Sequence, residues 1–336
     1  MDNLSNQIGS FESIEVEFGD LDSSDDGSWE ERYASLKLLV QSDAGDLYKL
    51  REMKDALNDS NAAVRYLAAN SLKALDCEGV VDALLFALTD SYEWIRIRAI
   101  EGLGDRRAVE AVEPFIQYLD KDSNPKVRAT LVKHLGRFCE LKLVPLIASY
   151  LSDDDARVRA NAVEGLGFYP TEFVADILRP LKDDGNARIR ANVAVALSKG
   201  EANVSRGTID QLLSSPDLYE RMGAIYSIGE TREETYIPIL LQYLNDPSYL
   251  VQRNVCDAMI KFGIKLQGIL LKEIRTRKTE SFLLGSLRVL ASIADKKALK
   301  TLLKLQETGE GEVREAAERA IDEIYSRAKR LPTHVI

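Results

Sequence analysis

Apolar residues recur along the chain every three or four positions, which is the spacing of one buried face on an α-helix. The clearest stripe starts with a β-branched residue and an arginine, and small or apolar residues stand three and seven positions after that arginine. One example is Val64-Arg65, which continues to Ala68 and Leu72. The pattern predicts amphipathic helices, and no strand-like alternation of apolar and polar residues competes with it.

The arginine stripe repeats at an almost constant interval. Seven arginines share its phase, namely Arg65, Arg96, Arg128, Arg159, Arg190, Arg221 and Arg314. Successive members are 31 or 32 residues apart, and the last follows after 93 residues, which is three such steps. One pair of amphipathic helices cannot bury its own apolar face, whereas stacked pairs share one interior. The sequence therefore predicts an all-α fold, an α-α superhelix (solenoid) of about nine to ten two-helix repeats of about 31 residues.

Each repeat is expected to hold two helices. The first helix carries the arginine stripe, and a second, apolar helix follows it, as in residues 108–119 and 141–151. Glycines such as Gly104 and Gly136 stand near the ends of the first helices, where a left-handed glycine often closes a helix. The sequence therefore predicts left-handed helix ends at these glycines.

An aspartate stands six residues before most of the phased arginines. The pairs are Asp59 and Arg65, Asp90 and Arg96, Asp122 and Arg128, Asp153 and Arg159, and Asp184 and Arg190. A row of acidic or metal-binding sites is one interpretation, but recurrence in every repeat favours architecture. An aspartate can cap the helix that follows it, and an arginine can bridge neighbouring turns through two parallel hydrogen bonds. We therefore expect a structural ladder between repeats.

Residues 29–330 resemble the HEAT-like repeats of the phycobilisome-lyase type. The D-x5-R-x2-A-x3-L-G pattern carries this resemblance, for example from Asp90 to Gly104 and from Asp153 to Gly167. The resemblance implies the solenoid fold, but it is unspecific for function because relatives include bilin lyase subunits, chaperones and adaptors. It leaves open, as an alternative function, a bilin lyase or chaperone-type subunit that acts on phycobiliproteins.

Charge divides the chain into a strongly acidic beginning and a nearly neutral remainder. The net charge is −10, and residues 1–28 hold eight acids and no Lys or Arg, which leaves −2 for the rest. We expect a disordered acidic tail over 1–28, the repeat array over 29–330 and a short tail over 331–336. Ile14, Val16 and Phe18 alternate within the acidic tail. It is therefore expected to dock on a partner, or to fold back on the solenoid and block it.

The composition disfavours several classes of partner and location. A nearly neutral body with an acidic tail lacks the basic surface that phosphate backbones require, so no nucleic-acid partner is expected. No apolar run is long enough for membrane insertion, and no secretion signal opens the sequence. We therefore expect a cytoplasmic protein, and the resemblance to the phycobilisome-lyase type of repeat implies a bacterial one.

Motifs for catalysis and metal binding are missing from the sequence. The two histidines, His134 and His334, are not spaced as zinc ligands, and His134 is expected to be structural. No nucleophile elbow occurs, and Cys77, Cys139 and Cys256 are expected to be unpaired core residues. We therefore expect no metal and no cofactor, and the sequence favours a protein that is not an enzyme.

The remaining candidate for function is an outer face of the helices. The second helices are expected to line the concave side of the solenoid. Their outward row consists of Phe86, Gln117, Ser149, Arg179, Gln211, Gln242 and Lys272, with Tyr118, Tyr150 and Tyr243 beside it. Tyr and Arg are enriched at protein interfaces, and an ordinary solvated face is the alternative. Trp94, just before a first helix, is either a binding anchor or a side chain that packs on the adjacent repeat.

These features together predict a protein–protein interaction scaffold or adaptor without enzymatic activity. An unidentified partner protein would bind along the concave second-helix surface, through many modest contacts spread over several repeats. The bilin lyase or chaperone-type subunit remains the alternative.

Overall fold

The computed structural model describes residues 28–277 and 279–330, and every regular element within these ranges is a helix. The first helices are α1 (Trp29–Gln41), α3 (Ala62–Leu72), α5 (Glu93–Arg106), α7 (Pro125–Gly136), α9 (Ala156–Leu166), α11 (Ala187–Leu197), α13 (Leu218–Thr231), α15 (Tyr249–Phe262), α17 (Glu280–Ile293) and α19 (Gly311–Arg330). The second helices are α2 (Asp46–Ala56), α4 (Val80–Ala87), α6 (Val112–Lys121), α8 (Val144–Ser149), α10 (Thr171–Leu178), α12 (Ala202–Leu213), α14 (Ile237–Tyr243), α16 (Gln267–Glu273) and α18 (Leu299–Thr308). The predicted all-α fold of two-helix repeats is confirmed.

The repeat is regular at the level of single positions. Arg65, Arg96 and Arg128 are each the fourth residue of a first helix, as are the other phased arginines. The apolar residue just before each arginine is buried, with an exposed fraction of 1% at Val64 and 0% at Ile95. Because the same helical face is buried in each repeat, the phase of the arginine stripe fixes where the core lies.

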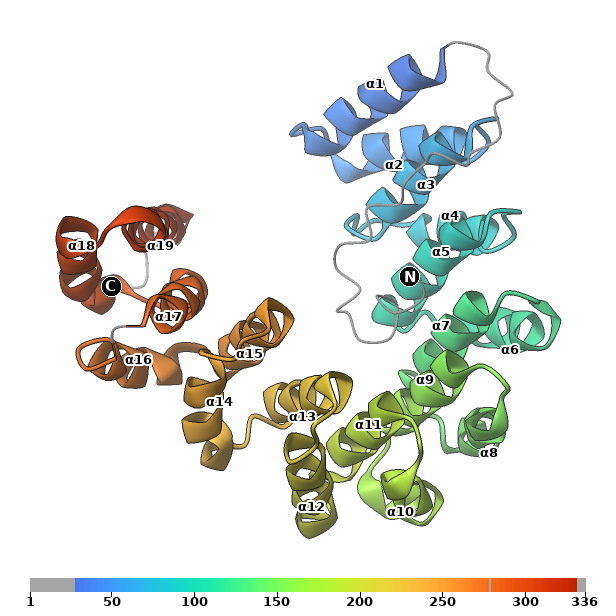
Figure 1. Ribbon diagram of the computed structural model, residues 1–336. Coiled ribbons are helices and arrows are strands. Elements are labelled where there is room, and N and C mark those ends of the chain that lie inside the picture. Colours follow the sequence, from blue (N-terminus) through green and yellow to red (C-terminus); the bar gives the residue numbers. More distant parts are fainter. Residues whose placement is uncertain (1–27, 278, 331–336) are drawn as a thin grey trace. The chain divides into compact units, whose positions relative to one another are not determined.

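The described helices divide into two compact units. The first unit ends at Glu201 and contains α1 to α11, and the second begins at Ala202 and contains α12 to α19. The sequence predicts one uninterrupted array, whereas the contacts between helices distinguish these two units. Figure 1 shows the alternation of first and second helices within each of them.

Apolar side chains from both kinds of helix form the core of the first unit. The second helices contribute Leu84, Phe115, Ile147 and Leu178, all with an exposed fraction of 0%. Burying one such side chain stabilises the fold by about 1.5–3 kcal/mol. At the start of this unit, Glu31 and Ser35 are exposed at phases where Val64 and Ala68 are buried one repeat later. Polar residues therefore end the row of repeats at α1, as a terminal repeat requires.

Gly104 and Gly136 serve close packing rather than helix termination, whereas Gly263 ends α15 with a positive φ of 69°. A Cβ atom on Gly136 would lie 2.1 Å from the carbonyl oxygen of Gly165, and one on Gly104 would lie 2.2 Å from Nδ1 of His134. Neither glycine has a positive φ, and the left-handed residues that follow these helices are Arg107 (φ 52°) and Cys139 (φ 56°). The prediction of left-handed ends at Gly104 and Gly136 is therefore wrong, because these positions lie where two helices almost touch.

The close packing decides which helices lie on the inner side of the first unit. The first helix α7 packs directly on α5 and α9, whereas neighbouring second helices such as α6 and α8 are further apart. A row of repeats bends toward its tightly packed side, and Figure 1 shows α7, α9 and α11 on the inner side of α6, α8 and α10. For these repeats of the first unit, the assignment of the concave surface to the second helices is therefore wrong. Glycines at these contacts, such as Gly136 against Gly165, let the first helices approach closely.

Candidate interaction surface

The phased arginines join the turn of one repeat to the turn of the next. Arg96 donates from Nε to Oδ2 of Asp122 (2.8 Å) and from Nη2 to Oδ1 of the same residue (3.1 Å). Its Nη1 also donates to the carbonyl oxygens of Asp90 (2.9 Å) and Ser91 (3.0 Å) in its own turn. The side chains of Arg96 and Asp122 are only 13% and 5% exposed. One guanidinium therefore fastens two successive turns together.

This bidentate bridge changes along the first unit. Arginine–aspartate pairs between neighbouring repeats are Arg32 with Asp59, Arg65 with Asp90, Arg96 with Asp122, and Arg128 with Asp153. The last is a single contact of 3.5 Å. Arg159 instead donates to the carbonyl oxygens of Asp153 (2.7 Å) and Asp154 (3.0 Å), and within the described ranges no carboxylate forms an ion pair with it. Arg190 donates from Nη1 to the carbonyl oxygen of Asp184.

The aspartates that stand six residues before the phased arginines do not cap the first helices. Oδ1 of Asp59 accepts the N–H of Asn61 (2.8 Å), and Oδ1 of Asn61 in turn accepts the N–H of Ala63 (2.8 Å). The cap of α3 is therefore Asn61, and the expected capping role of the aspartate is wrong. Asp59 lies two residues too early to reach the helix, so its carboxylate closes the turn and faces Arg32.

The residues predicted to bind a partner lie on the second helices. Phe86 is 50% exposed, Arg179 is half-buried, and the other members of the outward row, Gln117, Ser149, Gln211, Gln242 and Lys272, are exposed. Arg179 forms ion pairs with Asp176 (2.9 Å) and with Glu201. Members of this row in the first unit face away from its inner side, because the second helices are the outer layer there. The structure therefore does not bring them together on a concave surface.

The tyrosines beside that row are half-buried and tied to their neighbours. The Tyr150 hydroxyl donates to Oδ1 of Asp120 (3.0 Å), and burial together with this bond raises the pKa of Tyr150 to about 12. The Tyr243 hydroxyl donates to the carbonyl oxygen of Leu213 (3.4 Å), and Tyr118 is half-buried. Tyr150 and Tyr243 therefore link neighbouring repeats.

A line of large side chains runs along the first turns of four first helices in the first unit. Its members are the second residues of α5, α7, α9 and α11, namely Trp94, Lys126, Arg157 and Arg188, and we call them the first-turn stripe. Nζ of Lys126 lies 4.5 Å from the centroid of the Trp94 indole, which is a cation–π contact. All four side chains are partly exposed. Trp94 therefore packs against the adjacent repeat and stays partly exposed, and its role as a binding anchor stays a prediction.

The two outer arginines of the first-turn stripe are held in place by their neighbours. Arg157 forms two bonds with Asp155, from Nε to Oδ1 (3.0 Å) and from Nη2 to Oδ2 (2.7 Å). The hydrogen bond from Arg157 is the main cause that lowers the pKa of Asp155. Arg188 donates from Nη2 to Oδ1 of Asn161 (2.9 Å), and the Asn161 amide donates to the carbonyl oxygen of Ala129 (2.9 Å). A chain of hydrogen bonds thus spans three first helices beneath the stripe.

Charge is distributed unequally between the two layers of the first unit. The first helices α3, α5, α7, α9 and α11 hold 11 basic and 4 acidic residues, whereas the second helices α4, α6, α8 and α10 hold 1 basic and 5 acidic residues. Three of these arginines, Arg65, Arg96 and Arg128, face aspartates of the turns. The first helices of this unit are therefore more basic than its second helices.

The position of the stripe cations is electrostatically unfavourable for the helices themselves. The N-terminus of a helix carries a partial positive charge, so a cation in the first turn costs about 0.3–1 kcal/mol and an anion there is stabilised. Yet α7, α9 and α11 have no acidic residue in the first turn, and Lys126, Arg157 and Arg188 occupy it. Local rules that are broken repeatedly at one place often mark a functional surface. Lys126 and Arg188 at the N-termini of α7 and α11 favour an anionic ligand, whereas Arg157 is already paired with the carboxylate of Asp155, which caps α9.

Sequence reasoning missed three of the four stripe residues. The sequence predicts Trp94 as a possible binding anchor, but it does not single out Lys126, Arg157 or Arg188. The signal was available, since each stands two residues before a phased arginine. It was overlooked because the first helices were expected to lie on the convex side.

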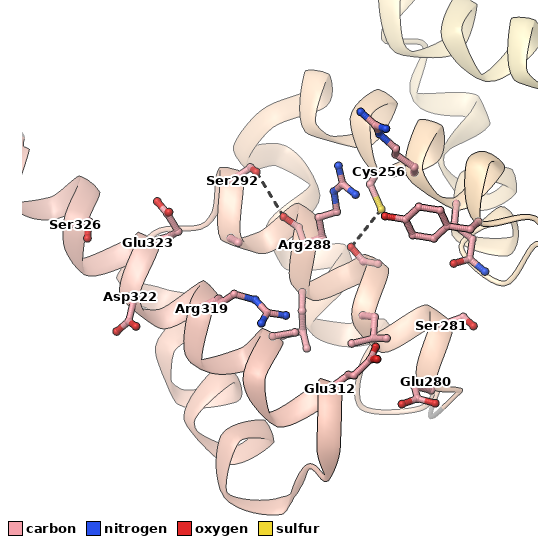
Figure 2. A pocket seen from close by; sticks show the side chains of 18 of the residues that line it. Cys256, Glu280, Ser281, Arg288, Ser292, Glu312, Arg319, Asp322, Glu323 and Ser326 are labelled. Atoms are coloured by element: carbon pink, nitrogen blue, oxygen red, sulfur yellow. Dashed lines mark hydrogen bonds between the residues drawn. The ribbon is translucent and has the colours of Figure 1, made fainter. Parts of the chain in front are cut away.

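The second unit has a groove on its first helices (Figure 2). The cavity has a volume of about 1100 Å³ and lies across α15, α17 and α19. Small side chains in its lining leave this space open, namely Ser281, Gly285, Ala291, Ser292 and Ala316. Arg288 and Arg319 lie in the middle, with Glu280 and Glu312 toward one end and Asp322 and Glu323 toward the other.

The groove offers polar contacts of both signs rather than a reactive centre. Its four arginines, Arg253, Arg288, Arg319 and Arg327, are matched by four acids. Arg327 donates to the carbonyl oxygens of Ser292 (2.9 Å) and Ala294 (2.9 Å), which fastens α19 to the end of α17. Burial raises the pKa of the Cys256 thiol to about 11, so this thiol stays protonated near neutral pH. It therefore lacks the thiolate character of a catalytic cysteine.

His134 is buried in the interface between α5 and α7, with an exposed fraction of 5%. Burial, with a contribution from Lys133, holds the pKa of His134 well below its ordinary value of 6.5. Among the residues that the structure describes, none forms a hydrogen bond with its Nδ1 atom. His134 is thus a neutral packing residue. His334 and the acidic segment 1–27 lie outside the described residues.

The described ranges lack metal-binding clusters and membrane-spanning helices. No cluster of three or more His, Cys, Asp or Glu side chains is placed to hold a metal ion within residues 28–277 and 279–330. None of the helices found there combines the length and the apolar composition that crossing a bilayer requires.

Comparison with known proteins identifies the repeat. The family model described as HEAT repeats matches residues 23–104, 50–121, 112–198 and 205–283, which together make up more than half of the chain. No curated protein matches the sequence. The family model covers both units, in agreement with the resemblance that the D-x5-R-x2-A-x3-L-G pattern carries.

Solved structures with a similar fold are distant in sequence. The Escherichia coli protein YibA is 17% identical, with a TM-score of 0.42 over 92% of this chain and 99% of that one. Human deoxyhypusine hydroxylase is 16% identical, with a TM-score of 0.37 over 84% of this chain and 97% of that one. The CpcE–CpcF complex of phycocyanin lyase from a Nostoc species is 18% identical, with a TM-score of 0.39 over 82% of this chain and 94% of that one. No conclusion about function follows from likeness at this level.

Proposed function

The chain belongs to the HEAT repeat family, and on that premise we propose that it is a protein-binding scaffold. The first unit binds an extended, acidic segment of a partner protein along the first-turn stripe. The observation that carries this proposal is the placement of Lys126, Arg157 and Arg188 in the first turns of consecutive first helices, where each cation opposes its own helix dipole.

The spacing of the stripe suits an extended peptide. Packed helices lie about 8–10 Å apart, and an extended chain advances about 3.3 Å per residue. One acidic residue in every three would therefore meet one stripe cation in each repeat. Trp94 at one end supplies an aromatic face for an apolar side chain.

The residues beneath the stripe favour binding because they already hold the stripe side chains and the turns in place. Arg157 and Arg188 are already fixed by Asp155 and Asn161, and Arg96 and Asp122 hold the turns behind them. A surface whose side chains are ordered before binding loses less conformational entropy when a ligand arrives. This proposed function places recognition on the inner layer of the first unit rather than on the second helices.

The test is a charge-reversal experiment with a matched control. The full chain is immobilised, bound proteins are recovered from native lysate, and the recovered partner is purified and titrated against variants. We expect the double variant Lys126→Glu/Arg157→Glu to bind at least tenfold more weakly, which corresponds to about 1.4 kcal/mol. The control Lys121→Glu/Lys142→Glu makes the same change in net charge on the second-helix side and should bind normally.

Two outcomes would contradict the proposal. Equal loss of binding in both double variants would indicate a general effect of net charge rather than a site. Unchanged binding in both would place the interface elsewhere. Because exposed charges are screened by salt, affinity of the unmodified chain should also fall between 50 and 300 mM salt.

A further inference from the structure

We infer that residues 11–27 of the chain itself occupy the first-turn stripe when no partner is bound. This inference rests on the proposed function, because it names a competitor for the same surface. Residues 1–28 contain eight acids and no basic residue, which complements the basic inner layer of the first unit. The same segment carries apolar residues that suit the face of Trp94, namely Phe11, Ile14, Val16, Phe18 and Leu21.

The segment joins α1 at nearly the same position along the helix axis as the stripe residues occupy on their own helices. It enters α1 at Trp29, three residues before Arg32, and the stripe residues lie two residues before their own arginines. The end of the segment and the stripe are therefore at nearly the same height along parallel first helices. A chain that runs across the repeats from Ser28 would therefore follow the stripe without being displaced along the helix axes.

The length of the segment is also sufficient. Trp94, Lys126, Arg157 and Arg188 lie two, three, four and five repeats beyond the repeat that contains α1. At about 10 Å per repeat and about 3.3 Å per residue, these distances correspond to about 6, 9, 12 and 15 residues before Ser28. The segment extends 27 residues before that position, so it spans the whole stripe.

The same estimate of distances places acids of the segment beside the cations of the first-turn stripe. Leu21 falls close to Trp94, Asp20 close to Lys126, Glu17 or Glu15 close to Arg157, and Glu12 close to Arg188. Acids separated by three residues, such as Glu12 and Glu15 or Glu17 and Asp20, match the advance of about one repeat for every three extended residues. The chain therefore contains a ligand with the charge, the apolar residues and the register that the stripe requires.

Trp94 provides a direct optical report on this contact. The chain has two tryptophans, Trp29 and Trp94, so Trp29→Phe leaves Trp94 as the single emitter in the full chain. A second full-length variant adds Glu12→Gln, Glu15→Gln, Glu17→Gln and Asp20→Asn, which neutralises the segment without removing it. A synthetic peptide of residues 8–27 is then titrated into both chains, and a peptide with the same four neutral substitutions is the control.

The expected result is competition. We expect the neutralised chain to show shifted Trp94 emission and to bind the acidic peptide with a Kd on the order of 0.1 mM. A tethered segment has an effective concentration on the order of millimolar, so the chain with the native segment should bind the peptide about tenfold more weakly. Raising the salt should remove this difference, and the neutral peptide should not bind.

Three results would overturn the inference. One is identical Trp94 emission in the two chains together with equal peptide affinity. Another is peptide binding that survives Lys126→Glu/Arg157→Glu. A third is an emission change that depends on protein concentration in sedimentation experiments, which would indicate a second copy as the occupant. If the partner binds the stripe equally well with native and neutralised segments, the scaffold function stands and only the competition fails.

Discussion

Replacing Arg96 with alanine removes the guanidinium that joins the turn before α5 to the turn before α7. Four hydrogen bonds are lost, two to the Asp122 carboxylate and one each to the carbonyl oxygens of Asp90 and Ser91. A typical bond contributes about 0.5–1.5 kcal/mol net, and bonds to charged groups contribute more. The Asp122 carboxylate, whose side chain is only 5% exposed, would also remain without its cation.

Those contributions set the expected magnitude. Breaking a buried ion pair by removing one partner costs about 3–5 kcal/mol, and the partial exposure of the Arg96 side chain, 13%, places the value near the lower end. We therefore expect Arg96→Ala to lower the free energy of unfolding by about 3 kcal/mol. Arg159 is the matched control, because it donates to two carbonyl oxygens without a carboxylate partner in the described ranges. Arg159→Ala should cost about 1–2 kcal/mol.

The assay is equilibrium unfolding in urea at pH 7, followed by helical circular dichroism. A double-mutant cycle of Arg96→Met with Asp122→Asn isolates the pair, and we expect a coupling energy of about 1–3 kcal/mol. If Arg96→Ala and Arg159→Ala have the same effect, the carboxylate bridge adds nothing to the carbonyl contacts. If neither variant changes the unfolding midpoint, the ladder does not stabilise the repeats at all.

Three further predictions concern the interfaces between first helices. Gly104→Ala should destabilise the first unit by about 1–3 kcal/mol through overpacking, because its Cβ would lie 2.2 Å from Nδ1 of His134. Thermal melting measures this loss, and Gly185→Ala is the control because its Cβ would have no neighbouring atom within 4 Å. Since the pKa of folded His134 lies well below 6.5, the free energy of unfolding should be highest above about pH 6.5. At lower pH it should fall by up to about 1.4 kcal/mol per pH unit. Urea titrations between pH 7 and 5.5 should show this slope for the unmodified chain and not for His134→Met. Asn161→Ala should cost about 1–3 kcal/mol, because the buried Asn161 amide no longer donates to the carbonyl oxygen of Ala129 and no longer accepts from Arg188; an unchanged unfolding midpoint would mean that these bonds are dispensable.

The sequence by itself determined the helical repeat and its phase. The spacing of Arg65, Arg96 and Arg128 placed each arginine at the fourth residue of a first helix, because the period of a buried helical face is a local property that each repeat must satisfy. The same regularity indicated that the aspartates and arginines of the turns are architectural. The stripe cations Lys126, Arg157 and Arg188 could not be interpreted in the same way. A cation two residues before an arginine indicates a shared surface only once the arrangement of the helices in the layer is known.

Only the tertiary structure decided which layer faces inward and which carboxylate each arginine meets. That choice depends on how closely neighbouring helices approach, and Gly136 against Gly165 or Gly104 against His134 is a contact between repeats that no local spacing reveals. For the same reason, Arg96 reaches Asp122 of the next repeat rather than a carboxylate of its own turn. The first-turn stripe exists because the fold aligns residues about 31 positions apart, and this alignment turns four separate side chains into one surface.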